Sequence, residues 1–383
     1  VLCGKYGADF ATACLGLCPL YVLNSHYMTV DISMVFWIIF SLFYIAMFVQ
    51  KRKFSYIAAS AFVLGIATGT KYPAGILVYY GIYKKSIGIF TRDMAILFLL
   101  FFAGFLITTP YCIIAFDEFK RDVLYQTSAR GIGPAGISSY INSFINFFAA
   151  IWIGSYTLLF LFVLSIYFLA KRRIFEDRII LTGLVLAIAP LFIAGGFKYA
   201  RYYLPLFPFL CLAVGSFFNE ISRIEKKKIK VCVILLCILT MVPVLVKSVL
   251  YSKLMSQKDI RIVAAEYIHN NIPEKTRIVF TKDPWIFEVP PVNPLKYEIM
   301  VQKNLDKVPG KSFLIVGELQ YFLTCGNRNR QMQNIIEFCQ KKGFRLEKIF
   351  ENEIGFGRFR FDCHWTLHDM IYTHPKIFLF YKP

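Results

Sequence analysis

The sequence contains few charged residues for its length, and this scarcity argues against most soluble protein classes. Only 17% of the 383 residues are Asp, Glu, Lys or Arg, whereas 57% are apolar. An average soluble domain carries about 25% charged residues. Acidic residues are scarcer than basic ones: the chain has 24 Asp and Glu but 43 Lys and Arg, which leaves a net charge of +19. The composition argues against an ordinary water-soluble enzyme. The net charge is compatible with a nucleic acid or a membrane surface as partner, and the positions of the basic residues must decide between them.

Three familiar patterns are also missing. The ten cysteines include no CxxC pair at metal-ligand spacing, so most are expected to be small buried residues. No glycine-rich phosphate loop follows a predicted strand. The chain opens at Val1 inside an apolar stretch and shows no signal-peptide pattern, which we interpret as an amino-terminal truncation.

Long apolar runs are what the sequence has instead. About 20 mainly apolar residues are needed to cross a bilayer as a helix. Runs of about that length cover 6–24, 32–50, 93–110, 145–170, 178–197, 200–218 and 229–250. A further run, 54–83, carries GTKYP near its middle and is interpreted as a short hairpin bent at Lys71. The sequence therefore predicts an α-helical multi-pass membrane protein with about 8–9 membrane helices, one segment being a short hairpin.

Basic residues predict the orientation of these helices, because Lys and Arg gather in short cytoplasmic loops. Five basic clusters lie at Lys5, 51–53, 84–92, 171–173 and 223–228. All five fall on one face if the 54–83 segment enters and leaves on the same side. The opposite, extracytoplasmic face then receives residues 26–31, 111–144, 198–201 and the whole tail. We expect a multi-pass integral membrane protein, in the cell membrane if the source is prokaryotic.

The tail differs in character from the membrane domain 1–251. Residues 252–383 contain an amphipathic helical pattern ending at Pro273, followed by short strand-like and helical segments. The expected order is helix 259–273, strands 276–281 and 312–318, helix 331–344 and strand 345–350. This order predicts a small C-terminal extracytoplasmic α/β domain. Its three cysteines, Cys325, Cys339 and Cys363, leave room for one disulfide.

Asp31 is the leading candidate for chemistry, since an acid near membrane depth is costly unless it has a task. It begins an apolar helix, and His26, just upstream, is a further candidate for a catalytic role. An acid at a helix start also caps the helix and complements its dipole. From the residues alone, capping and function remain about equally supported and are compatible.

Two further segments place cations near the expected outer face. Lys198, Arg201 and Tyr202 lie between two apolar runs, where they form a plausible clamp for a phosphate. The alternative is a basic and aromatic interfacial belt, which is common at helix ends. Lys71 and Tyr72 lie at the bend of the predicted hairpin. The alternative for Lys71 is a side chain that snorkels to the interface.

The loop after residue 110 supplies weaker candidates for an acceptor-binding or loop role: Asp117, Glu118, Gln126 and Arg130. Long loops of this kind often carry function. A solvated, charged loop is the alternative for most of these residues.

Five segments together resemble a known family. They are KYGADFATACLGLCPLYVLNSHYMTVD, LGIATGTKYPAGILV, PYCIIAFDEFKRDVLYQ, KYARYYLPLFPFLCLAVGSF and the closing IYTHPKIFLFYK, in which Thr373 replaces the family's acid. Their content and order are similar to the GT-C glycosyltransferases of the protein O-mannosyltransferase and aminoarabinose transferase type, family 39.

The resemblance implies a membrane enzyme that takes a sugar, such as mannose or a similar hexose, from a polyprenyl-phosphate donor. The acceptor would be a protein, lipid or glycan on the extracytoplasmic face. Such enzymes use two acidic positions, of which the second matches Asp31 and the first has no match in this sequence. Lys71, Lys198 and Arg201 would contact the donor phosphate, and Tyr202 would donate a hydrogen bond near it. Asp31 would orient the acceptor or help to hold a divalent metal ion, and no other cofactor is expected.

Two other function classes are compatible with parts of the composition. A transporter or flippase of a lipid-linked sugar would use intramembrane cations along a path, but the candidates here crowd the outer face. A nucleic-acid binder would explain the net charge, but the basic residues sit in short turns and no binding module is recognised. We therefore predict membrane lipid, a polyprenyl-phosphate sugar and an acceptor as partners, and no nucleic acid.

Overall fold

A computed structural model describes most of the chain as two compact units, Val1–Ser248 and Val249–Pro383. The residues outside the description are 1, 28, 72–90, 130–140, 142–143, 146–147, 150–155, 173, 194–198, 322–325, 353, 357–358 and 361–364. Each unit is considered by itself.

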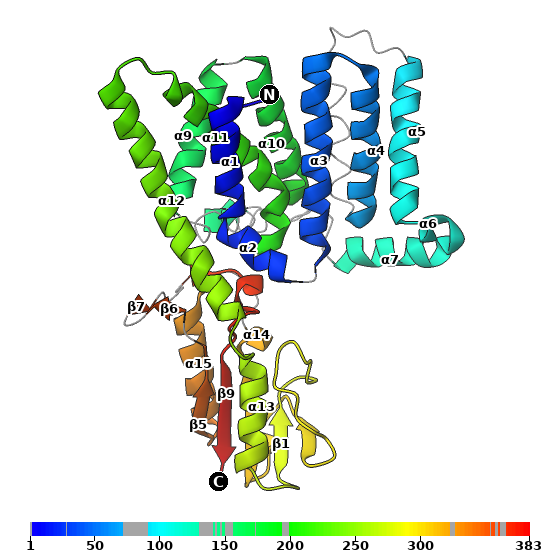
Figure 1. Cartoon of the computed structure of the whole chain (residues 1–383). Coiled ribbons are helices and arrows are strands. Elements are labelled where there is room, and N and C mark those ends of the chain that lie inside the picture. Colours follow the sequence, from blue (N-terminus) through cyan, green and yellow to red (C-terminus); the bar gives the residue numbers. More distant parts are fainter. Residues whose placement is uncertain are drawn as a thin grey trace. The chain divides into compact units, whose positions relative to one another are not determined.

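Unit 1 is helical, and its helices begin and end near the limits of the apolar runs (Figure 1). They are α1 (Gly4–Gly16), α2 (Pro19–His26), α3 (Val30–Lys51), α4 (Phe54–Thr70), α5 (Thr91–Thr108), α6 (Tyr111–Ile114), α7 (Phe116–Ala129), α9 (Tyr156–Arg172), α10 (Phe175–Ile193), the 3-10 helix η2 (Ala200–Leu206), α11 (Phe207–Ser222) and α12 (Lys227–Met255).

The apolar helices are those of an integral membrane protein. Among the described residues, three helices are long and apolar enough to cross a bilayer: Val30–Lys51, Ala200–Ser222 and the helix that begins at Lys227. The pair α1 and α2, bent by 54°, makes a fourth if it counts as one span. The bend breaks the predicted 6–24 helix before Pro19, which has no N–H to continue it. The predicted total of 8–9 membrane helices is not confirmed.

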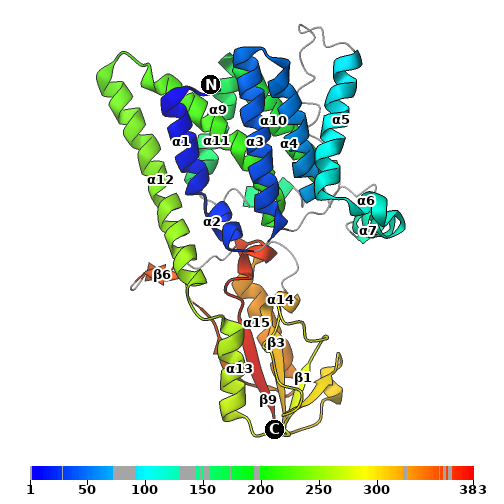
Figure 2. The same cartoon turned by 45° about the vertical axis from the view of Figure 1, so that its right-hand side comes forward.

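Helices α3, α4 and α5 stand side by side (Figures 1 and 2). Gly65 of α4 lies against the backbone of Phe101 in α5, and Gly69 lies against Thr108. The two helices are therefore parallel, and both begin at the same end of the pair. That arrangement fits a chain that enters and leaves the 54–83 segment on one side. The predicted return lies within 72–90, outside the described residues.

Two glycines bring α1 and α11 into backbone contact. A Cβ on Gly215 would stand 2.3 Å from the carbonyl oxygen of Gly7, and a Cβ on Gly7 would stand 2.2 Å from the carbonyl oxygen of Gly215. The rings of Phe10 and Phe218 stack beside this crossing with centroids 4.2 Å apart. Small residues at a crossing allow close van der Waals packing, which is a main source of helix association in membranes.

One arginine joins the ends of three helices in unit 1. Arg172, at the end of α9, donates two hydrogen bonds to the buried Asp177 of α10, at 2.8 and 2.5 Å. It also donates to the Ser216 hydroxyl at 2.6 Å and lies 2.8 Å from a carboxylate oxygen of Glu220, both on α11. This network fixes the spacing of α9, α10 and α11 at one end of the bundle.

Unit 2 is a mixed α/β unit around a five-stranded sheet of order β2-β1-β3-β9-β5. Strands β1, β2 and β3 are mutually parallel, and β9 runs antiparallel to both β3 and β5. Its elements are α13 (Ile260–Asn271), β1 (Arg277–Phe280), β2 (Glu298–Val301), η3 (Leu305–Lys307), β3 (Ser312–Gly317), α14 (Glu318–Tyr321), β4 (Gly326–Asn327), α15 (Arg328–Lys341), β5 (Arg345–Phe350), β6 (Gly355–Phe356), β7 (Phe359–Arg360), β8 (Trp365–Thr366), η4 (His368–Ile371) and β9 (Ile377–Lys382).

The two faces of the sheet are covered by α13 and α15. Ile260, Ala264 and Ile268 of α13 pack on one face, while Met332 and Cys339 of α15 pack on the other. The predicted helices and strands of the tail are confirmed, whereas β2 and the interior strand β9 were not predicted. Cys339 is a buried free thiol whose pKa is raised to about 12 by burial. The other two cysteines of the tail, Cys325 and Cys363, lie outside the described residues.

We predict that Gly215→Leu destabilises unit 1 by about 1–3 kcal/mol, because the larger side chain forces α1 and α11 apart. The measurement is the thermal unfolding midpoint of the purified chain in detergent. Gly16→Ala is the matched control, since no atom lies within 4 Å of the added Cβ. Equal midpoints for the two variants would contradict the packing role of Gly215.

Candidate functional site

Asp31 and Lys71 form an ion pair at one end of the α3–α4 pair. Asp31 lies in the first turn of α3 and is 3% exposed, while Lys71 directly follows the last residue of α4. The N-cap position of α3 belongs to Thr29, whose side chain makes no capping hydrogen bond. Asp31 complements the helix dipole from inside the first turn, but its carboxylate is directed to Lys71. Capping alone therefore does not account for this acid.

Aromatic rings and a second cation surround this pair. The Lys71 Nζ lies 4.8 Å from the ring centre of Tyr202, which belongs to η2. The Arg201 guanidinium lies 4.6 Å from the ring of Tyr199 and 5.7 Å from that of Tyr202. The two tyrosine rings meet edge to face at 5.5 Å. We call Asp31, Lys71, Tyr199, Arg201 and Tyr202 the Asp31 cluster.

The position of η2 is fixed by buried contacts with α2. The Tyr21 hydroxyl of α2 donates a 2.6 Å hydrogen bond to the carbonyl oxygen of Leu204. Leu204 and its neighbour Tyr203 are buried, so η2 is held firmly against the bundle. The sequence motif predicted a helix through this segment, and the structure shows a 3-10 turn that passes into α11 at Phe207. This turn presents Arg201 and Tyr202 beside Lys71.

Two buried acceptor atoms near the start of α3 remain without hydrogen bonds. They are Oδ1 of Asn24 and Oγ1 of Thr29, for which the described part of the chain offers no partner. Asn24 is 1% exposed, and Thr29 lies two residues before Asp31. Buried polar atoms are usually satisfied, so unpaired ones are typical of places where a ligand or water binds.

The other predicted residues are not gathered into this cluster by any described contact. His26 is exposed, and its Nδ1 lies 2.7 Å from the carbonyl oxygen of Val22 in its own helix. Asp117 and Glu118 are exposed in the first turn of α7, and Gln126 lies further along that helix. Three predicted residues lie outside the described residues: Tyr72, Arg130 and Lys198.

The residues described do not form a divalent-metal site. No three His, Cys, Asp or Glu side chains gather into a group that could hold an ion anywhere in the described ranges. The Asp31 carboxylate, which would help to hold such an ion if one binds, is paired with Lys71 in the structure.

The pairing of Asp31 with Lys71 was missed by the sequence analysis, although the sequence holds a signal for it. Helix α3 has 22 residues and α4 has 17, and the turn at 52–53 joins them. Residues at equal distances from such a turn lie opposite each other in an antiparallel pair. Asp31 lies 21 residues before Arg52 and Lys71 lies 18 residues after Lys53, a difference of less than one helical turn, so the two side chains come within reach of each other. Tyr199 was also missed as a site residue.

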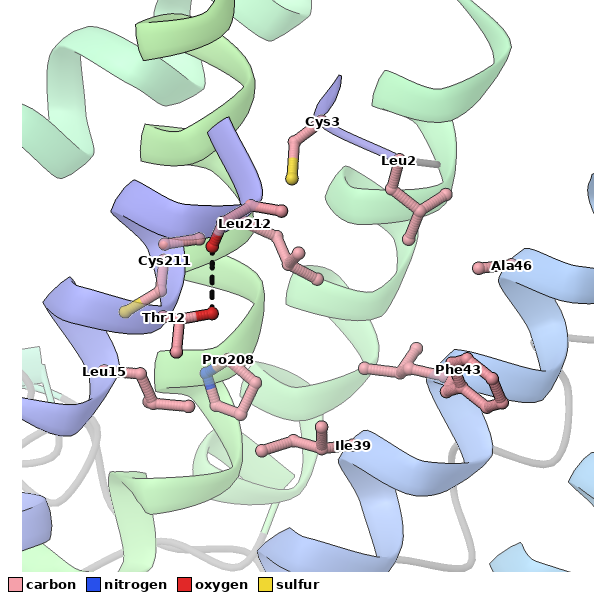
Figure 3. Close-up of a pocket in the computed structure, with 13 residues that line it drawn as sticks. Leu2, Cys3, Thr12, Leu15, Ile39, Phe43, Ala46, Pro208, Cys211 and Leu212 are labelled. Atoms are coloured by element: carbon pink, nitrogen blue, oxygen red, sulfur yellow. Dashed lines mark hydrogen bonds between the residues drawn. The ribbon is translucent and has the colours of Figure 1, made fainter. Parts of the chain in front are cut away.

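An apolar cavity of about 380 Å³ lies elsewhere in unit 1, between α1, α3 and α11. Figure 3 shows Leu15 and Pro208 on one side of the cavity and Ile39 and Phe43 on the other. Nearly all of its lining side chains are apolar. The cavity suits a hydrocarbon chain better than a polar molecule.

The amino-terminal part of the chain matches a known family. Residues 1–114 match the family described as dolichyl-phosphate-mannose-protein mannosyltransferase. The match covers 114 of the 383 residues and includes Asp31 and Lys71, but it does not reach Arg201 or Tyr202. No curated protein and no solved structure matches the chain. The match supports the broader resemblance to membrane glycosyltransferases of the protein mannosyltransferase type, and not a particular subtype.

Unit 2 contains a second buried ion pair with a different character. Arg328 donates two hydrogen bonds to Glu318, at 2.5 and 2.7 Å, and a third to the carbonyl oxygen of His374 at 2.7 Å. The backbone N–H of Lys376 donates to Glu318 at 2.8 Å. Burial, together with the nearby charges of Arg328 and Lys376, holds the pKa of His374 well below its usual range. The Nδ1 of His374 lies 2.8 Å from the Thr373 hydroxyl.

We predict that removing one partner of the Asp31–Lys71 pair costs more stability than removing both. Asp31→Leu or Lys71→Leu alone leaves a poorly solvated charge and should cost about 3–5 kcal/mol. The double variant Asp31→Leu/Lys71→Leu should recover much of that loss. Thermal unfolding of the four proteins in one detergent gives the coupling free energy. Additive losses would show that the pair does not interact.

We also predict that unit 2 loses stability in acid because of His374. The unfolded chain binds a proton near pH 6.5, whereas the folded chain keeps His374 neutral to a lower pH. The free energy of unfolding should therefore fall by up to about 1.4 kcal/mol per pH unit below 6.5, until the folded pKa is reached. Hydrogen exchange of the β9 amides in the whole protein measures this slope.

Two variants isolate the contribution of His374. His374→Asn removes the titrating group and should flatten the slope between pH 6.5 and pH 5. Thr373→Asp places an acid beside His374, raises its pKa and should also reduce the slope. The same slope in the wild type and in His374→Asn would show that other groups cause the acid sensitivity.

Proposed function

We propose that the chain is a membrane glycosyltransferase that moves a hexose, such as mannose, from a polyprenyl phosphate to a protein, lipid or glycan acceptor on the extracytoplasmic face. The observation that carries the proposal is the Asp31 cluster, which lies within and beside the segment that matches the mannosyltransferase family. The cluster provides an acid and two cations at the ends of apolar helices.

The cluster suits the charges that develop during transfer. As the bond from the sugar carbon to the phosphate oxygen breaks, the oxygen gains negative charge, and nearby cations stabilise it. Arg201 suits this role because its guanidinium can bind two phosphate oxygens at once. Lys71 lies beside the same tyrosine ring and supplies the second charge. The acceptor oxygen replaces the polyprenyl phosphate on the sugar carbon, and the proton of the acceptor hydroxyl passes to the departing phosphate.

Asp31 is assigned to the acceptor. Its carboxylate can accept a hydrogen bond from the acceptor hydroxyl and thereby orient the attacking oxygen. Lys71 links the two halves of the reaction, because a bound phosphate competes with Asp31 for the same ammonium group. A donor that draws Lys71 away leaves the carboxylate available for the acceptor.

The apolar cavity between α1, α3 and α11 is assigned to part of the polyprenyl tail. Its volume falls within the usual range of about 300–1,000 Å³ for ligand pockets. Helix α3 contributes both Asp31 at its start and Ile39 and Phe43 to the cavity wall. One helix therefore connects the proposed reaction site with the proposed tail site.

We predict that Asp31→Asn and Arg201→Ala each reduce sugar transfer at least about tenfold, which corresponds to about 1.4 kcal/mol in the barrier. Lys71→Gln should mainly raise the KM for the donor. The assay follows labelled sugar from polyprenyl-phosphate mannose to acceptor in proteoliposomes, with protein content checked in the membrane fraction.

Matched controls come from the exposed pair Arg121 and Asp122 on α7, whose side chains are 73% and 74% exposed. Arg121→Ala and Asp122→Asn should retain wild-type transfer. Wild-type rates in both Asp31→Asn and Arg201→Ala would refute the site. Movement of the sugar lipid across the bilayer without transfer would instead favour a flippase.

A further inference from the structure

Unit 2 exposes three consecutive apolar side chains on the loop that follows β1. Trp285, Ile286 and Phe287 are 54%, 61% and 55% exposed. The rings of Trp285 and Phe287 meet edge to face with centroids 5.2 Å apart. Large apolar side chains gathered on one exposed loop are typical of contacts with a membrane or a partner molecule.

The backbone of this loop is held by specific contacts. The N–H groups of Glu288 and Val289 donate to the carbonyl oxygen of Trp285 at 2.8 and 3.1 Å. Arg261 donates to the carbonyl oxygen of Phe287 at 2.7 Å, and Val289 is buried. The three side chains are therefore presented on a fixed turn.

Arg261 connects the loop to the place where the chain enters unit 2. It is the second residue of α13, and its guanidinium also bonds to Asp259, which caps that helix. Helix α12 ends at Met255, four residues before Asp259. The Arg261 side chain thus ties the loop directly to the residues that follow the last apolar helix.

The sheet places the loop at the same end of unit 2. The loop follows the carboxyl end of β1, and a Cβ on Gly317, the last residue of the parallel strand β3, would stand 2.2 Å from the carbonyl oxygen of Glu288. The carboxyl ends of β1 and β3, the start of α13 and the loop therefore gather where the chain arrives from α12.

We propose that Trp285, Ile286 and Phe287 insert into the interface of the leaflet from which α12 emerges. The occupant of this apolar surface is lipid, because the surface lies at the end of unit 2 that is continuous with a membrane helix. Trp suits the interface, since its ring is apolar and its N–H reaches water or headgroups. Ile286 and Phe287 enter the acyl region.

This insertion is independent of the proposed sugar transfer. It requires only that the chain is embedded in a membrane, so it holds for a transferase and for a flippase alike. Its effect is to fix the carboxyl end of the sheet at the lipid surface.

Trp285 itself is the probe for the test. The whole chain is reconstituted in nanodiscs made with ordinary lipids or with lipids brominated on the acyl chains. The measurement is tryptophan fluorescence, and the emission of Trp285 is the difference between the wild type and Trp285→Phe. If the loop inserts by about 5–10 Å, the fluorescence of Trp285 should fall by about half or more in brominated lipid. The same insertion should shield Trp285 from quenching by iodide in the water.

A relocated tryptophan provides the matched control. Leu295 is 94% exposed. The backbone N–H of Lys275, just before β1, donates to the carbonyl oxygen of its neighbour Lys296, which places Leu295 at the opposite end of that strand. In Trp285→Phe/Leu295→Trp, the new tryptophan should be quenched by iodide and not by brominated lipid.

Two outcomes would overturn the proposal. Quenching of Trp285 by iodide alone would show that the loop stays in water. Protection of Trp285 from both quenchers would show that the loop is covered by protein, either this chain or a copurifying polypeptide.

Discussion

The fold of unit 1 around its candidate site depends on the ion pair between Asp31 and Lys71. Taking two charges out of water costs several kcal/mol per ion, so the surrounding structure must hold both partners in register. The antiparallel hairpin of α3 and α4 supplies that register. The parallel packing of α5 on α4, with backbone contact at Gly65, then limits how far α4 can shift. On the other side, the Tyr21–Leu204 hydrogen bond holds η2 so that Tyr202 lies beside Lys71. A displacement in any of these elements would leave a charge poorly compensated.

Much of this architecture could be predicted from the sequence, because membrane helices are defined by local composition. The run 32–50 became α3 at Val30–Lys51, and Pro273 marked the end of α13 within two residues. Strand β9 was not predicted, although its sequence IFLFYK is strongly apolar. It lies between β3 and β5 and is covered on both faces, so it lacks the alternation that distinguishes a strand. Its identity as a strand depends on partners distant in sequence, which local patterns do not reveal.

The candidate site shows the same division between local and distant information. Asp31, Lys71, Arg201 and Tyr202 were identified by their chemistry, since each is a polar residue next to a long apolar run. The relation between them was not identified. Lys71 was assigned to a phosphate and Asp31 to an acceptor as if they were independent, whereas the structure pairs them.

The two buried ion pairs differ in a way that separates structure from function. In unit 2 the Glu318 carboxylate accepts bonds from Arg328 and from the Lys376 backbone, and Arg328 also bonds to His374. Such a satisfied network holds α14, α15 and the start of β9 together and has little capacity for a ligand. In unit 1, by contrast, Asn24 of α2 and Thr29 just before α3 keep buried oxygens without hydrogen bonds in the described part of the chain. Leaving such groups unpaired costs about 1–3 kcal/mol each, a cost that ligand or water binding can offset. The unpaired oxygens therefore support our proposal of a ligand site near the start of α3, whereas the Glu318–Arg328 network serves the fold.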